Sequence, residues 1–133
     1  MSAGSDNLSL VLLKSAGLQA DTILQDYTTL SSLLASNAEA TFTSYARKII
    51  TTGVTITLDF TANTATIGLG NQTWLAAGGA SNDTLGKLVV CYRQLSTSVD
   101  SATIPMTGHD ITATTTGSDL IVQIASGHLA LAS

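Results

Sequence analysis

The sequence predicts a mainly β fold: an antiparallel β-sandwich or barrel of about eight short strands with one N-terminal α-helix. Three patterns support this. Apolar and polar residues alternate from about residue 39 onward, turn residues separate short apolar runs, and residues 21–35 have helical spacing. A chain of 133 residues is long enough for one domain with a hydrophobic core, and we expect a single domain over residues 1–133.

The one predicted helix covers residues 21–35, and Asp21 or Thr22 can cap its start. Its apolar and aromatic residues are spaced to share one helical face: Ile23, Tyr27, Leu30 and Leu34. The preceding run NLSLVLLK, residues 7–14, has the length of a strand. Its periodicity does not separate a strand from a helix, so both remain open.

The segment GVTITLDF, residues 53–60, has the clearest strand alternation. Its apolar side chains are expected to point one way: Val54, Ile56, Leu58 and Phe60. This pattern predicts a half-buried strand with one face in water. The turn sequence TANT at 61–64 leads into ATIGL and predicts a β-hairpin.

Further strands are predicted in the second half of the chain. KLVVCYRQ at 87–94 is apolar on both faces and is expected to be a central strand. QTWLAA at 72–77 is another candidate strand. HDITATTT at 109–116 and DLIVQIA at 119–125 flank Gly117-Ser118, which predicts a second hairpin.

The composition is poor in charge and rich in hydroxyl groups. Charged residues make up 11% of the chain, against about 25% in an ordinary soluble domain, and there are 21 Thr and 15 Ser. A hydrophobic fraction of 44% argues against disorder. A surface with few charges is weakly protected against association. Two interpretations fit equally: a soluble β-protein with a threonine-rich face, or a protein whose surface neighbouring subunits cover.

The charge balance excludes several partners. A net charge of −4 with five cations argues against nucleic acid, which needs clustered Lys and Arg, and against an anionic membrane surface. No apolar stretch approaches membrane-spanning length, and no basic residues precede the N-terminal apolar run, so we expect no signal peptide. The single cysteine, Cys91, allows no intrachain disulfide and is expected in the core.

The stretch GGASNDTLGKLVV at 78–90 looks like a phosphate-binding loop but fails as one. The spacing between its glycines is too long, and Leu88 follows Lys87 where Ser or Thr would hold magnesium. A predicted strand, not a helix, comes after the loop. We therefore interpret Gly78 and Gly79 as turn residues.

No other motif assembles a catalytic or metal site. There is no G-x-S-x-G elbow, and the adjacent His109 and Asp110 face opposite sides of a strand, so they cannot act together as a base and its orienting acid. One Cys, two dispersed His and scattered carboxylates give no zinc or calcium spacing. We predict that the protein is not an enzyme and uses no cofactor and no metal.

The segment SYARKII at 44–50 holds two of the five cations beside Tyr45. One interpretation is a strand whose long polar side chains face water. The other is a subunit contact through Tyr45 and Arg47, because Tyr and Arg are favoured at interfaces. Trp74, the only Trp, is expected in the core.

Three segments together resemble a group of small virion-associated proteins encoded among the structural genes of tailed bacteriophages. They are EATFTSYARKIIT (39–51), QTWLAAGGASNDTLGKLVVCY (72–92) and IPMTGHDITATTTGSDLIVQI (104–124). The resemblance covers most of residues 20–133 in the same order. Arg93 stands where an acid is usual, and the loop at 93–103 is shorter and poorer in glycine. These departures affect loop-specific binding but not the strand pattern.

The resemblance implies a structural, non-catalytic role in a virion that is assembled in the host cytoplasm. The first expectation is a capsid decoration, or cement, protein. Such a protein docks on the major capsid protein or other virion proteins, forms a homo-oligomer and stabilises the mature head. The alternative is a neck, tail or baseplate component, and the second alternative is a receptor- or glycan-binding module.

In that role the expected interface residues are Tyr45, Arg47 and Arg93. Unpaired sheet edges are expected to be covered by neighbours or by a capsid arm that adds a strand. The apolar run 8–13 is a candidate for exchange with a neighbour, and burial in the core is the competing expectation.

Overall fold

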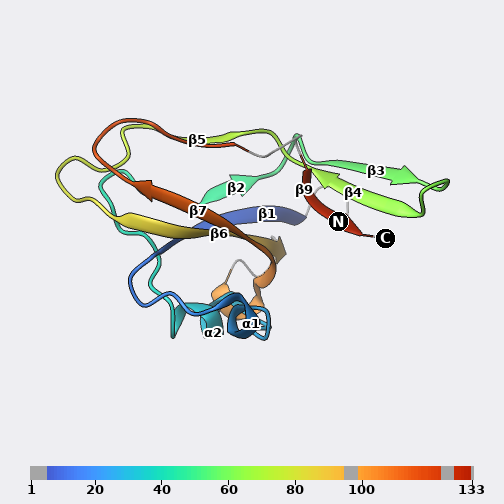
Figure 1. Cartoon of the computed structure of the whole chain (residues 1–133), viewed down its shortest axis with the longest axis horizontal. Helices are drawn as coiled ribbons and strands as arrows, with labels where there is room; N and C mark the ends of the chain where they lie inside the picture. Colours follow the sequence, from blue (N-terminus) through green and yellow to red (C-terminus); the bar gives the residue numbers. More distant parts are fainter. Residues whose placement is uncertain (1–5, 95–98, 124–127, 133) are drawn as a thin grey trace.

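A computed structural model describes residues 6–94, 99–123 and 128–132, the last range by its backbone (Figure 1). Its elements are β1 (Asp6–Lys14), α1 (Asp21–Leu24), α2 (Leu30–Leu34), β2 (Lys48–Ile50), β3 (Thr55–Asp59), β4 (Thr64–Gly68), β5 (Gln72–Trp74), β6 (Thr84–Gln94), the 3₁₀ helix η1 (Asp100–Ala102), β7 (Ile104–Thr114), β8 (Leu120–Val122) and β9 (His128–Ala132). The mainly β prediction is confirmed. The strands form antiparallel sheets, and none of the sheets in the described part of the chain closes into a barrel.

The central sheet has the strand order β2-β1-β6-β7 and forms the middle layer of the molecule. β1 is buried over seven consecutive residues, and β6 over five. The prediction of a central strand at 87–94 is therefore confirmed, and the run 7–14 is a strand. Strands begin at Asp6, ahead of the helices, and not only from about residue 39, where the alternation begins. The run 8–13 lies in the core of the chain, which bears out the expectation of burial.

Two apolar clusters cover the two faces of the central sheet, because successive side chains of a strand point to opposite faces. On one face, strands β1 and β6 pack against residues from β5, β8 and the loops: Phe42, Leu69, Trp74 and Val122. On the other face they pack against the helices through Leu24, Leu30 and Leu33. Figure 1 shows α1 and α2 on one side of the central sheet and β5 on the other.

The prediction of one helix at 21–35 is wrong, because the chain forms two short helices with a break at residues 25–29. Thr29 has an extended backbone (φ −133°, ψ 150°), and its hydroxyl accepts a hydrogen bond from the Ser32 backbone N–H at 3.2 Å. Threonine in this position caps a new helix rather than continuing the old one. The cap therefore separates α2 from α1.

The break also changes which residues the helices bury. Leu24 and Leu33 are buried, whereas Ile23, expected to face inward, is 47% exposed. The Leu30 backbone N–H donates to the Thr103 carbonyl at 2.8 Å, which ties the start of α2 to the segment after η1. The periodicity of one continuous helix does not apply to two helices with different axes.

The predicted hairpin between 109–116 and 119–125 is also wrong, although residues beyond 123 lie outside the described part. β7 pairs with β6, whereas β8 pairs with β5 in a separate two-stranded sheet. Instead of forming a hairpin turn, Gly117 packs against the backbone of Gly79. Its N–H donates a hydrogen bond to the Ala77 carbonyl at 2.7 Å. Both glycines have φ of +98°, and a Cβ on Gly117 would lie 3.3 Å from the Gly79 Cα.

The third sheet has the order β3-β4-β9 and contains the predicted β3–β4 hairpin, which is confirmed. The β3–β4 register runs without a shift from Thr55 opposite Gly68 to Asp59 opposite Thr64. Figure 1 shows the hairpin extending away from the central sheet. The predicted half-burial of 53–60 is wrong, because all five residues of β3 are exposed.

Candidate functional site

The most unusual surface of the molecule is the apolar face of the β3–β4 hairpin. The exposed fractions are 62% for Ile56, 56% for Leu58 and 88% for Phe60. Residues directly opposite in an antiparallel pair share a face, so Ile67 of β4 lies beside Ile56. We name Ile56, Leu58 and Phe60 the hairpin patch.

The base of the hairpin is anchored, although its tip is exposed. Val54 and Ile67 pack against the core cluster that contains Trp74. At the tip, the Asp59 side chain accepts hydrogen bonds from the backbone N–H groups of Thr61 and Ala62 at 2.9 and 3.0 Å. These bonds close the loop at 60–63 and hold the hairpin patch on an ordered strand pair.

The hairpin patch lies in a long segment with almost no charge. Between Lys48 and Asp83 the only charged residue is Asp59. The apolar alternation at 53–60 predicts a strand with one buried face, but that face is exposed. The missing charge was the signal that could have identified a contact surface, because exposed strands of soluble proteins normally carry charged side chains.

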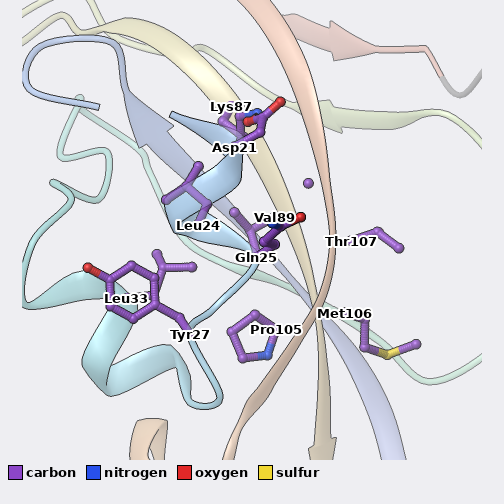
Figure 2. A pocket seen from close by; sticks show the side chains of 11 residues that line it. Asp21, Leu24, Gln25, Tyr27, Leu33, Lys87, Val89, Pro105, Met106 and Thr107 are labelled. Atoms are coloured by element: carbon purple, nitrogen blue, oxygen red, sulfur yellow. The ribbon is translucent and has the colours of Figure 1, made fainter. Parts of the chain in front are cut away.

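A cavity of about 280 Å³ opens between the helices and β7, on the face of the central sheet that the helices cover. Figure 2 shows Leu24, Tyr27 and Leu33 on the helix side and Pro105 and Met106 on the β7 side. The lining is mixed, and Asp21, Gln25, Lys87 and Thr107 add polar groups to it. At one end, Lys87 and Asp21 lie together at the rim (Figure 2).

The charged groups at this cavity form ion pairs with one another within the chain. The Lys87 side chain is 4% exposed, and its ammonium group contacts Asp21 and, at 2.7 Å, Asp110. Burial alone would lower the pKa of Lys87, but hydrogen bonds to Asp110 and Asp21 outweigh it and raise that pKa. A protonated ammonium held by two carboxylates is neither a base nor a nucleophile, so Lys87 has a structural role here.

Tyr45, expected at an interface, completes the edge of the central sheet. β2 pairs with β1 only as far as Leu10, and beyond it the Tyr45 hydroxyl accepts a hydrogen bond from the Leu12 backbone N–H at 3.2 Å. The same hydroxyl donates to Glu39 at 2.8 Å. Burial, followed by the Glu39 charge, raises the pKa of Tyr45, which keeps the hydroxyl protonated.

Arg47 joins the same network and links three parts of the chain. It makes bidentate contacts with Glu39, at 2.7 Å for both nitrogens, and with Asp100 at 2.6 and 3.0 Å. The two carboxylates raise the pKa of Arg47 above its already high value, and Arg47 in turn lowers the pKa of Asp100. The structure therefore brings Tyr45 and Arg47 together through Glu39, in contacts within one chain.

Arg93, the third expected interface residue, lies on β6 and is half-buried. It is opposite Asn7 of β1, and its charge adds to the lowering of the pKa of Asp100. The structure thus brings all three residues toward the Glu39–Asp100 side of the molecule. Their participation in an interface stays a prediction.

The remaining expectations for single residues hold. Trp74 is 3% exposed, donates to the Ala46 carbonyl at 2.8 Å, and has the Lys48 ammonium 5.4 Å from its ring centroid. Cys91 is fully buried, and burial raises the pKa of its thiol to about 12. His109 contacts Thr107 while the adjacent Asp110 contacts Lys87, so the two do not form a catalytic pair.

No group of three or more His, Cys, Asp or Glu side chains in residues 6–94 and 99–123 is placed to hold a metal ion. Among the described helices, none has the length and hydropathy that crossing a bilayer requires.

Comparisons with known proteins returned no match to a family model, to a curated protein or to a solved structure. The resemblance to virion-associated phage proteins therefore stays an expectation from the three quoted segments.

Proposed function

We propose that the chain is a structural protein of a tailed bacteriophage virion, and that it acts as a capsid decoration protein docked on the major capsid protein. The observation that carries the proposal is the hairpin patch, a set of large apolar side chains held in water on an ordered hairpin. The resemblance of three sequence segments to virion-associated proteins names the kind of particle.

Energetic reasoning supports an assembly role for this patch. Burial of apolar surface contributes about 25 cal/mol for each Å² removed from water. A side chain such as Phe60, 88% exposed, gains almost nothing from folding of its own chain. It gains that free energy only when another surface covers it, and exposed apolar patches on ordered elements are typical of protein interaction sites.

The proposed mechanism is stabilisation by mass action. A protein that binds the mature shell, and not its dissociated subunits, stabilises the shell in proportion to RT ln(1 + [L]/Kd), about 2.7 kcal/mol for each site at a hundredfold excess over Kd. A symmetric lattice repeats the site many times. A surface with few charges suits close and repeated contact between neighbours, because few charged groups lose their hydration.

The first test is the copy number of the chain in purified virions, by quantitative mass spectrometry scaled to the major capsid protein. We expect a ratio comparable to that of the capsid protein. A ratio far lower would favour the neck, tail or baseplate alternative. Absence from virions would overturn the structural role.

The second test adds the protein back to shells that lack it. We expect the wild-type chain to raise the melting temperature of the shells, and Phe60→Ser to lose most of this increase. Leu75→Ser is the matched control, because Leu75 is 68% exposed but lies outside the hairpin. Equal behaviour of the two variants would show that the hairpin patch is not the docking surface.

A further inference from the structure

The edges of the sheets differ in how they are protected against pairing with another chain. β7, the edge of the central sheet, has Pro105 near its start and two register shifts against β6. Proline and bulges of this kind hinder the addition of a further strand. β2, β5 and β8 have three residues each, which is too short for a stable new strand pair.

β3 has none of these protections. It is an edge strand of five residues, and it pairs with β4 without a register shift. It contains no Pro, no Gly and no Lys, and its Ile and Thr residues favour strands. An edge strand of this kind presents unpaired backbone N–H and C=O groups to any chain that can pair with them.

We propose that β3 pairs antiparallel with β3 of a second copy of this chain, with a two-fold axis at Thr57. The inference rests on the proposed assembly role of the hairpin, and it identifies a second copy of the chain as a partner of the hairpin. The edge of β3 contacts the second copy, and the apolar faces of the two hairpins together form the surface that meets the capsid. The two three-stranded sheets become one continuous sheet across the axis.

The sequence of β3 is complementary to itself in this register. Thr57 lies opposite Thr57 of the second copy, and Ile56 lies opposite Leu58 on both sides of the axis. Residues directly opposite share a face, so the four aliphatic side chains form one group at the centre of the joined sheet. The Thr57 pair on the axis is of the Thr–Thr kind that stabilises antiparallel strands through side-chain hydrogen bonds.

The one charged residue of the strand is accommodated in this register and excludes an alternative one. With the axis at Thr57, Asp59 lies opposite the Thr55 hydroxyl of the other copy, and no charges face each other. With the axis at Asp59, the two carboxylates would be directly opposite, which is destabilising. A shift by a single residue in the pairing would place apolar side chains opposite polar ones on the wrong face.

The solution state of the full chain tests the pairing. We expect sedimentation velocity from micromolar to near-millimolar concentrations to show a monomer–dimer equilibrium. Leu58→Lys should weaken the dimer by about tenfold or more, because a lysine at an edge is a common barrier to strand pairing. Leu75→Lys is the matched control and should dimerise as the wild type does, since Leu75 is also an exposed leucine, at 68% against 56% for Leu58, but lies outside β3.

Cross-linking tests the register. The Thr57→Cys variant should form a disulfide-linked dimer under mild oxidation, because the two positions face each other about 5 Å apart between Cβ atoms. The Thr55→Cys variant should not, since its two copies are separated by about 13 Å along the strands. Cys91 is fully buried, so the introduced thiol is the reactive one.

Each outcome decides the proposal. A wild-type monomer at all concentrations, an unchanged dimer in Leu58→Lys, or cross-linking through position 55 instead of 57 would overturn it. These results leave the proposed function separately testable. A monomer present in high copy number in virions would reject the β3 pairing alone, whereas a β3 dimer absent from virions would reject the virion role alone.

Discussion

β1 and β3 both carry large aliphatic side chains, but the two strands have opposite environments. β1 is buried over seven consecutive residues, and Leu10, Val11, Leu12 and Leu13 are all inaccessible to solvent. All five residues of β3 are exposed. β1 has a strand on each side and a layer on each face, whereas β3 has one strand beside it. Apolar side chains favour burial in both strands, but burial depends on neighbouring elements. The same chain supplies those elements for β1 and not for β3.

The largest expected effect is a difference in the free energy of unfolding between a substitution in β1 and one in β3. Leu10→Ala should lower the free energy of unfolding by about 2–5 kcal/mol, because it leaves a cavity in the filled core. Ile56→Ala should change it by less than about 0.5 kcal/mol in dilute solution, where the side chain is already in water. Urea unfolding at low protein concentration measures both. Equal losses would mean that β3 is covered within its own chain.

A smaller loss is expected where β1 itself depends on a side chain for its edge. Tyr45→Phe removes the acceptor of the Leu12 N–H and a donor to Glu39. The cost should be about 1–3 kcal/mol, which is typical of a buried polar group left unpaired. Tyr92→Phe is the matched control, because the Tyr92 hydroxyl hydrogen-bonds to a side chain, that of Asp6. Equal losses of stability in the two variants would contradict the role of Tyr45 as the hydrogen-bond acceptor for the Leu12 N–H.

The smallest expected effect is a loss of stability in acid. Arg47 lowers the pKa of Asp100 below its unfolded value, so this contribution is complete at neutral pH and is lost as pH falls through the folded pKa, below about 4. Asp100 is 39% exposed, so the loss should stay under about 1 kcal/mol. Urea midpoints measured from pH 7 to pH 3 should fall less steeply in Arg47→Met than in the wild type. Parallel curves would contradict the assignment.

Asp83 adds to the same acid sensitivity near β1. Its burial would raise the pKa, but the Thr41 backbone N–H at 2.5 Å and the Lys14 ammonium at 2.9 Å outweigh it and lower that pKa. β3 has only the exposed Asp59, whose bonds close a local turn. The acid sensitivity of Asp83 and Asp100 should report on the contacts with their partners Lys14, Thr41 and Arg47.

Local patterns were sufficient to predict the strands with two neighbours or a tight turn. KLVVCYRQ at 87–94 is apolar on both faces because both faces of β6 are covered. The β3–β4 hairpin follows from alternation and turn residues within a few positions of each other. Trp74 and Cys91 were placed in the core for the same reason: their size and polarity already favour burial.

Features decided by distant contacts were not predictable from local patterns. The break between α1 and α2 is fixed by the Thr29 cap and by a bond from Leu30 to Thr103. Gly117-Ser118 does mark a change of direction, but the strand that pairs with β8 is β5, more than forty residues earlier in the chain. The exposure of the hairpin patch was not predictable for a related reason. The alternation at Ile56 and Leu58 is the same in a strand that faces a core and in one that faces a partner.

The unprotected edge of β3 also bears on how the protein behaves when it is produced alone. A short segment with high β-propensity, a single charge and no proline is the kind that stacks into ordered aggregates when nothing covers it. A two-fold pair of β3 strands uses up this edge in both copies, so pairing through β3 stops at two molecules. Solubility in overexpression would then depend on the balance between closed pairing and open-ended stacking.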